Sequence, residues 1–417
     1  MEQLICGLLG EKLGHSYSPE LHALLGDYPY QLFEVAPRDL GDFLRRGEFH
    51  GLNVTIPYKR TLAEVCDELT DAASAIGSVN TVLRREDGSL FGDNTDAAGF
   101  EAMIRHGGIE IAGKKCLIFG SGGASLSVRY VLEKLGAGEI AVISRSGEDN
   151  YDNLDRHADA RVLVNATPLG TYPNTGVSPV DLRDFPCCEG VLDLVYNPAR
   201  THLLLQAEAL GIPHEGGLYM LAEQARRSAK VFFGEDFPLL TTQTAYDTLR
   251  ARKENRILIG MPGCGKTTVG KTLAELLDRP FLDADQELER ELGMPCGDYI
   301  TRNGEADFRQ REAAVLERLG KQSGMVIATG GGCVTRAENY PLLHQNGTII
   351  FLERPLSRLS REGRPLSQRG RLEDMYVIRL PMYRRFADCI VPNEGEDPAA
   401  TARAVEEAYE AFHHQRT

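Results

Sequence analysis

Short apolar runs alternate with helical patterns along most of this chain of 417 residues. Apolar runs typical of buried strands occupy residues 114–119, 139–146, 161–167, 190–196, 256–260, 326–332 and 347–353. Residues 128–138 lie between the first two runs and carry the apolar spacing of a helix that ends at Gly136. This alternation is typical of βαβ units, so it predicts an α/β protein with largely parallel sheets.

The runs fall into two series, separated by a polar segment at 236–255 that has no strong strand character. Residues 244–252 within this segment could form a short helix. At about 100–200 residues per domain, the length allows two to four domains. We therefore interpret 236–255 as a linker between two separately folded parts.

Composition restricts the class of protein. With 42% hydrophobic and 25% charged residues the chain has the balance of a soluble globular protein, and no apolar run approaches the ~20 residues of a membrane span. We expect no signal peptide, no membrane partner and a cytoplasmic location. The nine cysteines form no CxxC pair, which argues against disulfides and zinc. The net charge of −14 argues against a nucleic-acid partner, so any anionic ligand must be held by a few local cations and backbone N–H groups.

A phosphate-binding loop follows the run at 256–260. Its sequence, GMPGCGKT from Gly260 to Thr267, has the spacing GxxxxGK[ST] between a predicted strand and a predicted helix. In this context backbone N–H groups surround the β-phosphate, Lys266 reaches the β/γ oxygens, and the Thr267 hydroxyl is placed for Mg²⁺. The loop predicts nucleotide binding but leaves the acceptor of the phosphoryl group open.

Acidic, basic and glycine-rich motifs follow the loop. Asp283 and Asp285 come directly after a predicted strand, so one carboxylate can support Mg²⁺ while the other accepts a proton from an acceptor alcohol. Arg309 lies in GEADFRQRE, and TGGGCV at 329–334 allows a ligand to approach the backbone closely. REGRPLSQ at 361–368 has the composition of a basic lid, and RLPMYRRFAD at 379–388 begins with Arg379.

Taken in this order, the motifs of residues 256–417 resemble those of shikimate kinase. The resemblance implies that Asp285, Arg309, Gly331 and Arg379 bind shikimate, with the two arginines on its carboxylate. It implies that Asp285 orients or deprotonates the 3-hydroxyl, and that Lys266 and the lid residue Arg364 stabilise the transferring phosphoryl group. The residues implied for ATP and Mg²⁺ are Gly263, Cys264, Gly265, Thr267 and Thr268, with Thr267 and Asp283 on the metal. The lid between Arg358 and Arg364 is shorter than usual in this family, and no adenine-side arginine is assigned.

A second glycine-rich turn, GSGGAS at 120–125, follows the run at 114–119. It is a variant of the dinucleotide fingerprint, with Ser125 where Gly or Ala is expected. The run at 139–146 is followed by Ser144 and Arg145 with no acid for a ribose 2′-hydroxyl, and Arg145 can pair with a 2′-phosphate. These residues favour NADP(H) over NAD(H).

Candidate catalytic groups precede this turn. Hydroxyl groups come from Ser16 and Ser18 of GHSYSP, and NVTIPYK at 53–59 ends at Lys59. Lys59 in a chain that also offers Asp96 suggests a Lys–Asp pair that donates a proton to a carbonyl receiving hydride.

Together with NATPLG at 165–170, DLVYNP at 193–198 and GGLYMLAEQA at 216–225, these motifs resemble shikimate 5-dehydrogenase over residues 1 to about 235. The resemblance implies a substrate site with Lys59 and Asp96 catalytic, lined also by Ser16, Ser18, Thr55, Asn80, Tyr196 and Gln224. It places Leu194 and Gly217 beside the nicotinamide, Gly120, Ser121, Gly122, Gly123 and Ala124 beneath the pyrophosphate, and Ser144 and Arg145 at the 2′-phosphate. Ala23 and Thr171 depart from the residues usual in the family, and neither position carries a catalytic group.

The two resemblances imply an α/β substrate domain at 1–100, a Rossmann domain at 101–235 whose last helix returns to the first lobe, and a P-loop kinase domain at 256–417. The implied function is NADPH-dependent reduction of 3-dehydroshikimate to shikimate, followed by ATP-dependent phosphorylation at the 3-hydroxyl. Two alternatives keep the folds: a quinate dehydrogenase joined to another small-molecule kinase, and a chain in which one half is a non-catalytic nucleotide sensor. The sequence leaves the oligomeric state open, with a homodimer as one candidate.

Overall fold

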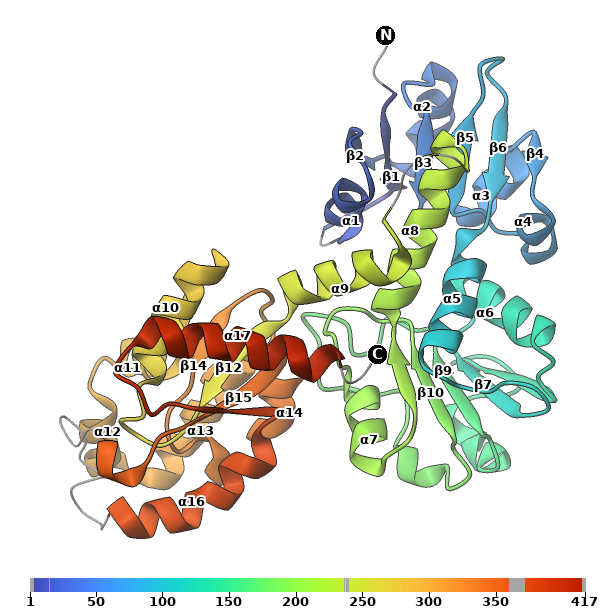
Figure 1. Cartoon of the computed structure of the whole chain (residues 1–417). Coiled ribbons are helices and arrows are strands. Elements are labelled where there is room, and N and C mark those ends of the chain that lie inside the picture. The colour runs from blue at the N-terminus through green and yellow to red at the C-terminus, as the bar shows by residue number, and fades with distance from the viewer. Residues whose placement is uncertain (1–3, 15, 236, 238–239, 360–371, 415–417) are drawn as a thin grey trace. The chain divides into compact units, whose positions relative to one another are not determined.

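The computed structural model describes residues 4–14, 16–235, 237, 240–359 and 372–414, and Figure 1 shows their helices and strands. The chain divides into two compact units, residues 1–197 with 201–251, and residues 198–200 with 252–417. Three sheets with helices on their faces make up these units, so the predicted α/β class with largely parallel sheets is confirmed. Among the described residues, no helix is both long enough and apolar enough to cross a membrane.

The first sheet of unit 1 has six strands in the order β2-β1-β3-β5-β6-β4. Its strands are β1 (Cys6–Gly10), β2 (Tyr30–Glu34), β3 (Gly51–Val54), β4 (Glu68–Leu69), β5 (Thr81–Arg84) and β6 (Leu90–Asp93). β5 runs antiparallel to β3 and β6, whereas the other pairs are parallel. The α-helices in this part are α1 (Ser18–Leu25), α2 (Leu40–Arg46), α3 (Lys59–Val65) and α4 (Asp71–Ile76).

The second sheet of unit 1 has five parallel strands in the order β11-β10-β9-β7-β8. Its strands are β7 (Lys115–Phe119), β8 (Glu139–Ile143), β9 (Val162–Asn165), β10 (Gly190–Asp193) and β11 (His214–Gly216). The α-helices in the rest of unit 1 are α5 (Thr95–His106), α6 (Gly123–Lys134), α7 (His202–Leu210), α8 (Gly217–Phe233) and α9 (Thr242–Lys253). α8 also packs against α1 and β5 of the first part.

Two elements of the second sheet differ in extent from the sequence expectation. α6 begins at Gly123, inside the glycine-rich turn, rather than at residue 128. The strand expected at 190–196 ends at Asp193, because the Asp193 carboxylate accepts a hydrogen bond from the backbone N–H of Val195 and turns the chain there. The apolar pattern encodes neither the start of α6 nor the end of β10.

Most of the segment that we expected as a linker is helix α9. The buried side chains of Ala245 and Leu249 pack in a cluster with α1 and α8, and the Thr242 hydroxyl donates to the carboxylate of Glu223 on α8. Only Glu254 separates the end of α9 from the next strand. Because the segment is polar overall, its sequence did not reveal that Ala245 and Leu249 are buried.

Unit 2 is built on a parallel sheet in the order β13-β14-β12-β15-β16. Its strands are β12 (Asn255–Ile259), β13 (Phe281–Asp283), β14 (Val326–Ala328), β15 (Gly347–Glu353) and β16 (Cys389–Pro392). Its α-helices are α10 (Lys266–Leu277), α11 (Ala284–Leu292), α12 (Cys296–Asn303), α13 (Glu305–Gly320), α14 (Asn339–His344), α16 (Leu372–Phe386) and α17 (Pro398–His414). β12 lies at the centre, so the loop that follows it opens at the carboxyl edge of the sheet, where ligands of such sheets bind.

Candidate functional site

The phosphate-binding loop joins β12 to α10 and forms one wall of a cavity of about 390 Å³ in unit 2. Lys266 is the first residue of α10, is nearly buried, and its Nζ donates to the carbonyls of Gly260 (2.9 Å) and Met261 (3.2 Å). The Thr267 hydroxyl donates to Asp283 Oδ2 at 2.7 Å. Gly263, Gly265 and Thr268 also line the cavity, whereas the side chain of Cys264 is fully buried.

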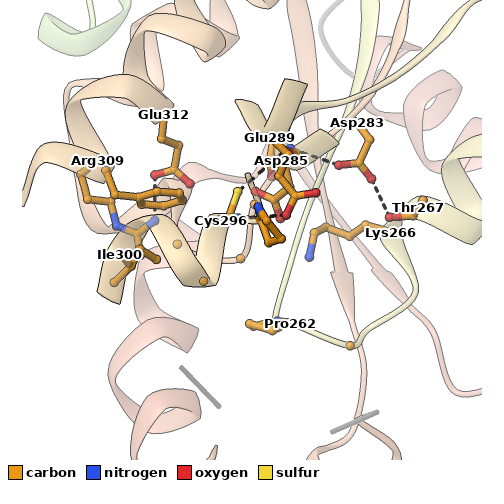
Figure 2. A pocket seen from close by; sticks show the side chains of 18 of the residues that line it. Pro262, Lys266, Thr267, Asp283, Asp285, Glu289, Cys296, Ile300, Arg309 and Glu312 are labelled. Carbon is orange, nitrogen blue, oxygen red and sulfur yellow. Dashed lines mark hydrogen bonds and ion pairs between the residues drawn. The ribbon is translucent and has the colours of Figure 1, made fainter. Parts of the chain in front are cut away.

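Asp285 lies at the centre of this cavity. Figure 2 shows Lys266, Thr267 and Asp283 on one side of the pocket, and Arg309 and Glu312 on the other. Burial raises the pKa of Asp285 to about 6, the negative charges of Asp283 and Glu312 add to this effect, and Lys266 opposes it. A carboxylate with this pKa is suited to accept a proton from an alcohol near neutral pH.

Arg309 of α13 is held by two carboxylates of the same helix. Its Nη1 pairs with Glu312 Oε2 at 2.8 Å, and its Nη2 pairs with Glu305 Oε1 at 3.0 Å. Glu312 is buried, and its second oxygen has no hydrogen-bond partner in the described part of the chain. Sequence reasoning missed Glu312, although its position three residues after Arg309 on a predicted helix was a usable signal.

The glycine run after β14, residues 330–332, packs against the side chains of Asp285, Arg309 and Glu312. A Cβ on Gly330 would collide with the carboxylates of Asp285 and Glu312, and a Cβ on Gly332 would collide with the guanidinium of Arg309. The carbonyl of Gly331 accepts hydrogen bonds from Arg379 Nη1 at 3.0 Å and from the Tyr383 hydroxyl. Asp285, Arg309 and Arg379 each contact this glycine run, and all three line the same cavity. Arg364 lies outside the described residues.

A second cavity lies in unit 1, in front of the carboxyl edges of its sheets. It is lined by Lys59, the first residue of α3, and by Asp96 in the first turn of α5. Their side chains form an ion pair, and Asn80 Nδ2 donates to the other Asp96 oxygen at 2.9 Å. The cavity therefore holds an ammonium group whose position is fixed by a chain of polar contacts.

The other substrate residues expected from the sequence also line this cavity, namely Ser16, Ser18, Thr55, Tyr196 and Gln224. Ser16 Oγ donates to Ser18 Oγ at 3.1 Å, and Asn80 Nδ2 lies 3.5 Å from Gln224 Oε1 of α8. Burial raises the pKa of the Tyr196 hydroxyl, which a hydrogen bond with Ser16 partly offsets.

A buried polar network behind Asn80 was not found from the sequence. The hydroxyl of Ser228 on α8 contacts Thr81 Oγ1 at 2.7 Å and Thr95 Oγ1 at 3.1 Å, and it accepts from Asn53 Nδ2 at 2.7 Å. Asn53 also lines the cavity. These residues come from β3, β5, α5 and α8, so only the tertiary fold reveals that they meet.

Part of the expected dinucleotide site borders the same cavity. Ala124, Leu194 and Gly217 line it, and the backbone of Gly217 lies so close to the carbonyl of Leu194 that a Cβ would collide with it. Gly120, Ser121, Gly122 and Gly123 form the turn from β7 into α6. Ser144 and Arg145 follow β8 directly and do not line the cavity.

Comparisons with known proteins agree with this division. The family model for shikimate kinase matches residues 262–410, and the model for the shikimate dehydrogenase substrate binding domain matches residues 8–82. The shikimate dehydrogenase (NADP(+)) of a Clostridium perfringens strain is 34% identical over 267 residues, which cover 59% of this chain and 98% of the relative.

Solved structures are similar to the same part of the chain. A chorismate mutase/shikimate 5-dehydrogenase fusion protein from Clostridium acetobutylicum matches with 34% identity and a TM-score of 0.55, over 60% of this chain and 98% of that chain. Shikimate 5-dehydrogenase from Thermus thermophilus in complex with NADP(H) and shikimate matches with 32% identity and a TM-score of 0.54, over 60% of this chain and 99% of that chain.

Proposed function

The chain belongs to the shikimate dehydrogenase family and carries a shikimate kinase domain after it, and from this premise we propose that one polypeptide reduces 3-dehydroshikimate with NADPH and then phosphorylates the resulting shikimate with ATP. The observation that supports it is that each cavity holds the groups that its step requires. These are the Lys59–Asp96 pair in unit 1, and Asp285 between Lys266 and Arg309 in unit 2.

Reduction of the ring ketone needs a proton donor beside the carbonyl oxygen. Lys59 supplies this proton, and Asp96 keeps the ammonium group aimed into the cavity while Asn80 fixes Asp96. Hydroxyl and amide groups of Ser16, Ser18, Thr55, Asn80, Tyr196 and Gln224 hold the polyol and its carboxylate. NADPH, when bound, supplies the hydride.

The turn that would hold NADPH fits a phosphate group. A Cβ on Gly122 would meet no atom within 4 Å, so the backbone there faces open space at the start of α6. Backbone N–H groups at a helix N-terminus favour anions. We assign the pyrophosphate to Gly120–Ala124, the nicotinamide to the wall at Leu194 and Gly217, and the 2′-phosphate to Ser144 and the exposed Arg145.

In the kinase domain, Asp285 accepts the proton of the shikimate 3-hydroxyl, while Arg309 and Arg379 bind the shikimate carboxylate beside Gly331. ATP supplies the phosphoryl group. Lys266 leaves its two backbone carbonyls to contact the phosphates that Gly263, Cys264, Gly265 and Thr268 surround. We also assign Arg364, which lies outside the described residues, to the charge of the transferring phosphoryl group.

The residues present also fit Mg²⁺. The Thr267 hydroxyl and the Asp283 carboxylate lie 2.7 Å apart and offer oxygen ligands of the kind that Mg²⁺ prefers beside nucleotide phosphates. Mg²⁺ beside a nucleotide is commonly held by one or two protein ligands together with phosphate oxygens and water. We therefore assign Mg²⁺ to Thr267 and Asp283.

A coupled assay on the intact chain tests the proposal. 3-Dehydroshikimate and NADPH are mixed and the absorbance of the reduced nicotinamide is followed, after which Mg·ATP is added and ADP release is followed. We expect NADPH oxidation and then stoichiometric ADP release, with Lys59→Met abolishing only reduction of 3-dehydroshikimate and Asp285→Asn abolishing only phosphorylation of shikimate. Absence of NADPH oxidation would contradict the first half, and absence of ADP release would contradict the second.

The same assay separates the alternatives. Turnover of quinate with NAD⁺, or of gluconate with ATP, at rates above those for shikimate would support other substrates. Binding of a nucleotide by a half that shows no turnover would support a sensor. The domain boundaries at 100, 235 and 256, a cytoplasmic location and a homodimer remain predictions; light scattering of the purified chain tests the last.

A further inference from the structure

A buried carboxylate in unit 1 has no part in the chemistry described above. Asp193 is the last residue of β10 and is 0% exposed, and in the described part of the chain no cation forms an ion pair with it. Burial raises the pKa of Asp193 to about 7, although three hydrogen bonds oppose this effect. Because a buried carboxylate without a cation is costly, its place at this strand end calls for an explanation.

Three donors from different elements meet at this carboxylate. Oδ1 accepts from Asn165 Nδ2 at the end of β9 (3.0 Å) and from the N–H of Val195 (3.0 Å), and Oδ2 accepts from Thr201 Oγ1 (2.6 Å) before α7. The Asp193 carboxylate therefore joins the end of β10 to the end of β9. It also fixes the chain at Val195 and the start of α7.

The segment that Asp193 fixes forms the wall of the cavity at Leu194 and Gly217. The N–H of Leu194 donates to the carbonyl of Asn165 at 3.0 Å, and the N–H of Gly217 donates to the carbonyl of Val195 at 3.1 Å. The backbone of Gly217 is in direct contact with the carbonyl of Leu194. A shift of residues 194–195 would therefore move Gly217, the first residue of α8.

Asn165 links Asp193 to the glycine-rich turn, because its amide contacts both Asp193 and Thr167. Its Oδ1 accepts from the N–H of Thr167 (3.0 Å) and from Thr167 Oγ1 (2.6 Å). The Thr167 methyl group lies against Gly120, where a Cβ would come within 2.9 Å of it. The two walls that we assign to the nicotinamide and the pyrophosphate are thus linked through Asp193 and Asn165.

We propose that Asp193 is a positioning residue for the NADP(H) site, because its carboxylate sets the backbone of residues 194–195 and, through Asn165, the glycine-rich turn. This inference rests on the proposed function, which assigns NADP(H) to those walls. This role requires that the side chain at position 193 accept hydrogen bonds; it does not require a negative charge. An amide oxygen can replace one carboxylate oxygen, whereas a methyl group takes the acceptor away from the Val195 N–H, from the Thr201 hydroxyl and from one N–H of the Asn165 amide, whose Nδ2 also donates to the carbonyl of Leu169.

The test compares the intact wild-type chain with Asp193→Ala, Asp193→Asn and the control Asp184→Ala, which removes an exposed carboxylate of the same sheet domain. Isothermal titration calorimetry gives the dissociation constants of NADP⁺ and of shikimate separately, and shikimate kinase activity reports whether unit 2 is folded. In Asp193→Ala we expect NADP⁺ to bind about tenfold more weakly while shikimate binding stays unchanged. Asp193→Asn and Asp184→Ala should bind both ligands as the wild type does.

Equal NADP⁺ affinity in Asp193→Ala and wild type would overturn the inference, as would an equal loss of shikimate affinity, which indicates a general structural role. If the wild type binds shikimate but not NADP⁺, the proposed cofactor is wrong and the inference falls with it. Should Asp193→Ala fail to fold, Thr201→Val removes one donor to Asp193, together with the hydroxyl that caps α7, with little change in shape, and Thr201→Ser restores the hydroxyl. Weaker NADP⁺ binding in the valine variant and recovery in the serine variant would support the inference, and equal binding in both would overturn it.

Discussion

The backbone of Gly332 lies directly against the guanidinium group of Arg309, leaving no room for a side chain between them. The φ of Gly332 is −103°, a value that alanine adopts readily, so the need for glycine at this position comes from the arginine and not from the backbone.

Gly332→Ala should therefore displace Arg309 without straining the chain. Because Arg309 is assigned to the shikimate carboxylate, we expect the KM for shikimate to rise about tenfold while the KM for ATP changes little. Steady-state kinetics of the kinase reaction measures both constants. Gly395→Ala, at an open position in the same unit, is the control and should leave both unchanged; a higher KM for ATP alone would contradict the assignment.

The kinase reaction should lose activity in acid as Asp285 takes up a proton. With a pKa of about 6 in the free enzyme, Asp285 is ionised and able to accept the hydroxyl proton only above that pH, so kcat/KM for shikimate should fall below it. Glu312→Gln removes a neighbouring negative charge that raises the pKa of Asp285, and this should move the acid limb to lower pH. Glu317→Gln, which changes an exposed glutamate on the same helix, should not move it. A limb at the same pH in Glu312→Gln and wild type would exclude Asp285 as its origin.

Asp96→Asn should impair reduction through Lys59. Without the carboxylate, the ammonium group loses the ion pair that aims it into the cavity, so kcat for 3-dehydroshikimate should fall about a hundredfold or more. Kinase activity of the same variant serves as an internal control for folding. Retention of full dehydrogenase activity would show that the pair is structural.

Arg145 should decide between NADPH and NADH. Since it is exposed at the end of β8 and assigned to the 2′-phosphate, Arg145→Leu should raise the KM for NADPH by about tenfold or more and leave the KM for NADH nearly unchanged. Arg129→Leu, at an exposed position on α6, provides the comparison. A parallel change for both coenzymes would place Arg145 elsewhere in the site.

The contribution of Asp193 to the free energy of unfolding should decrease as the pH rises. The contribution of a carboxylate in an ion pair increases instead. Its pKa of about 7 in the folded chain exceeds the value of about 3.9 expected when unfolded, so between these pH values the folded state holds the extra proton. This contribution to the free energy of unfolding is fully present below the unfolded pKa and is lost as the pH rises to about 7. Asp193→Asn keeps an acceptor and does not titrate, so the difference in unfolding free energy from wild type, measured in urea across this range, should change by up to a few kcal/mol. A constant difference would contradict the raised pKa.

The sequence predicted which residues line the two cavities better than it predicted the contacts that support them. Lys266 and Asp285 stand in motifs whose spacing carries chemistry, and Lys59 and Asp96 stand in motifs that resemble those of a known family. Each of the four lines one of the two cavities. Asn53 and Ser228 are single polar residues whose role depends on strands and helices far apart in the chain. The glycine run at 330–332 was expected to admit a ligand, but its packing against Arg309 and Asp285 could not be read without the fold.

Helix α9 determines at which residues the kinase domain could be replaced by another domain. Its buried residues complete a core with α1 and α8, and Glu254 immediately after it is buried in unit 2, where it accepts a hydrogen bond from the Tyr409 hydroxyl at 2.9 Å. A gene divided before or at Leu249 would strip the dehydrogenase of part of its own core. A chimera should keep Ala245 and Leu249 with the first enzyme and Glu254 with the second, which leaves only residues 250–253 as the place to join a new partner.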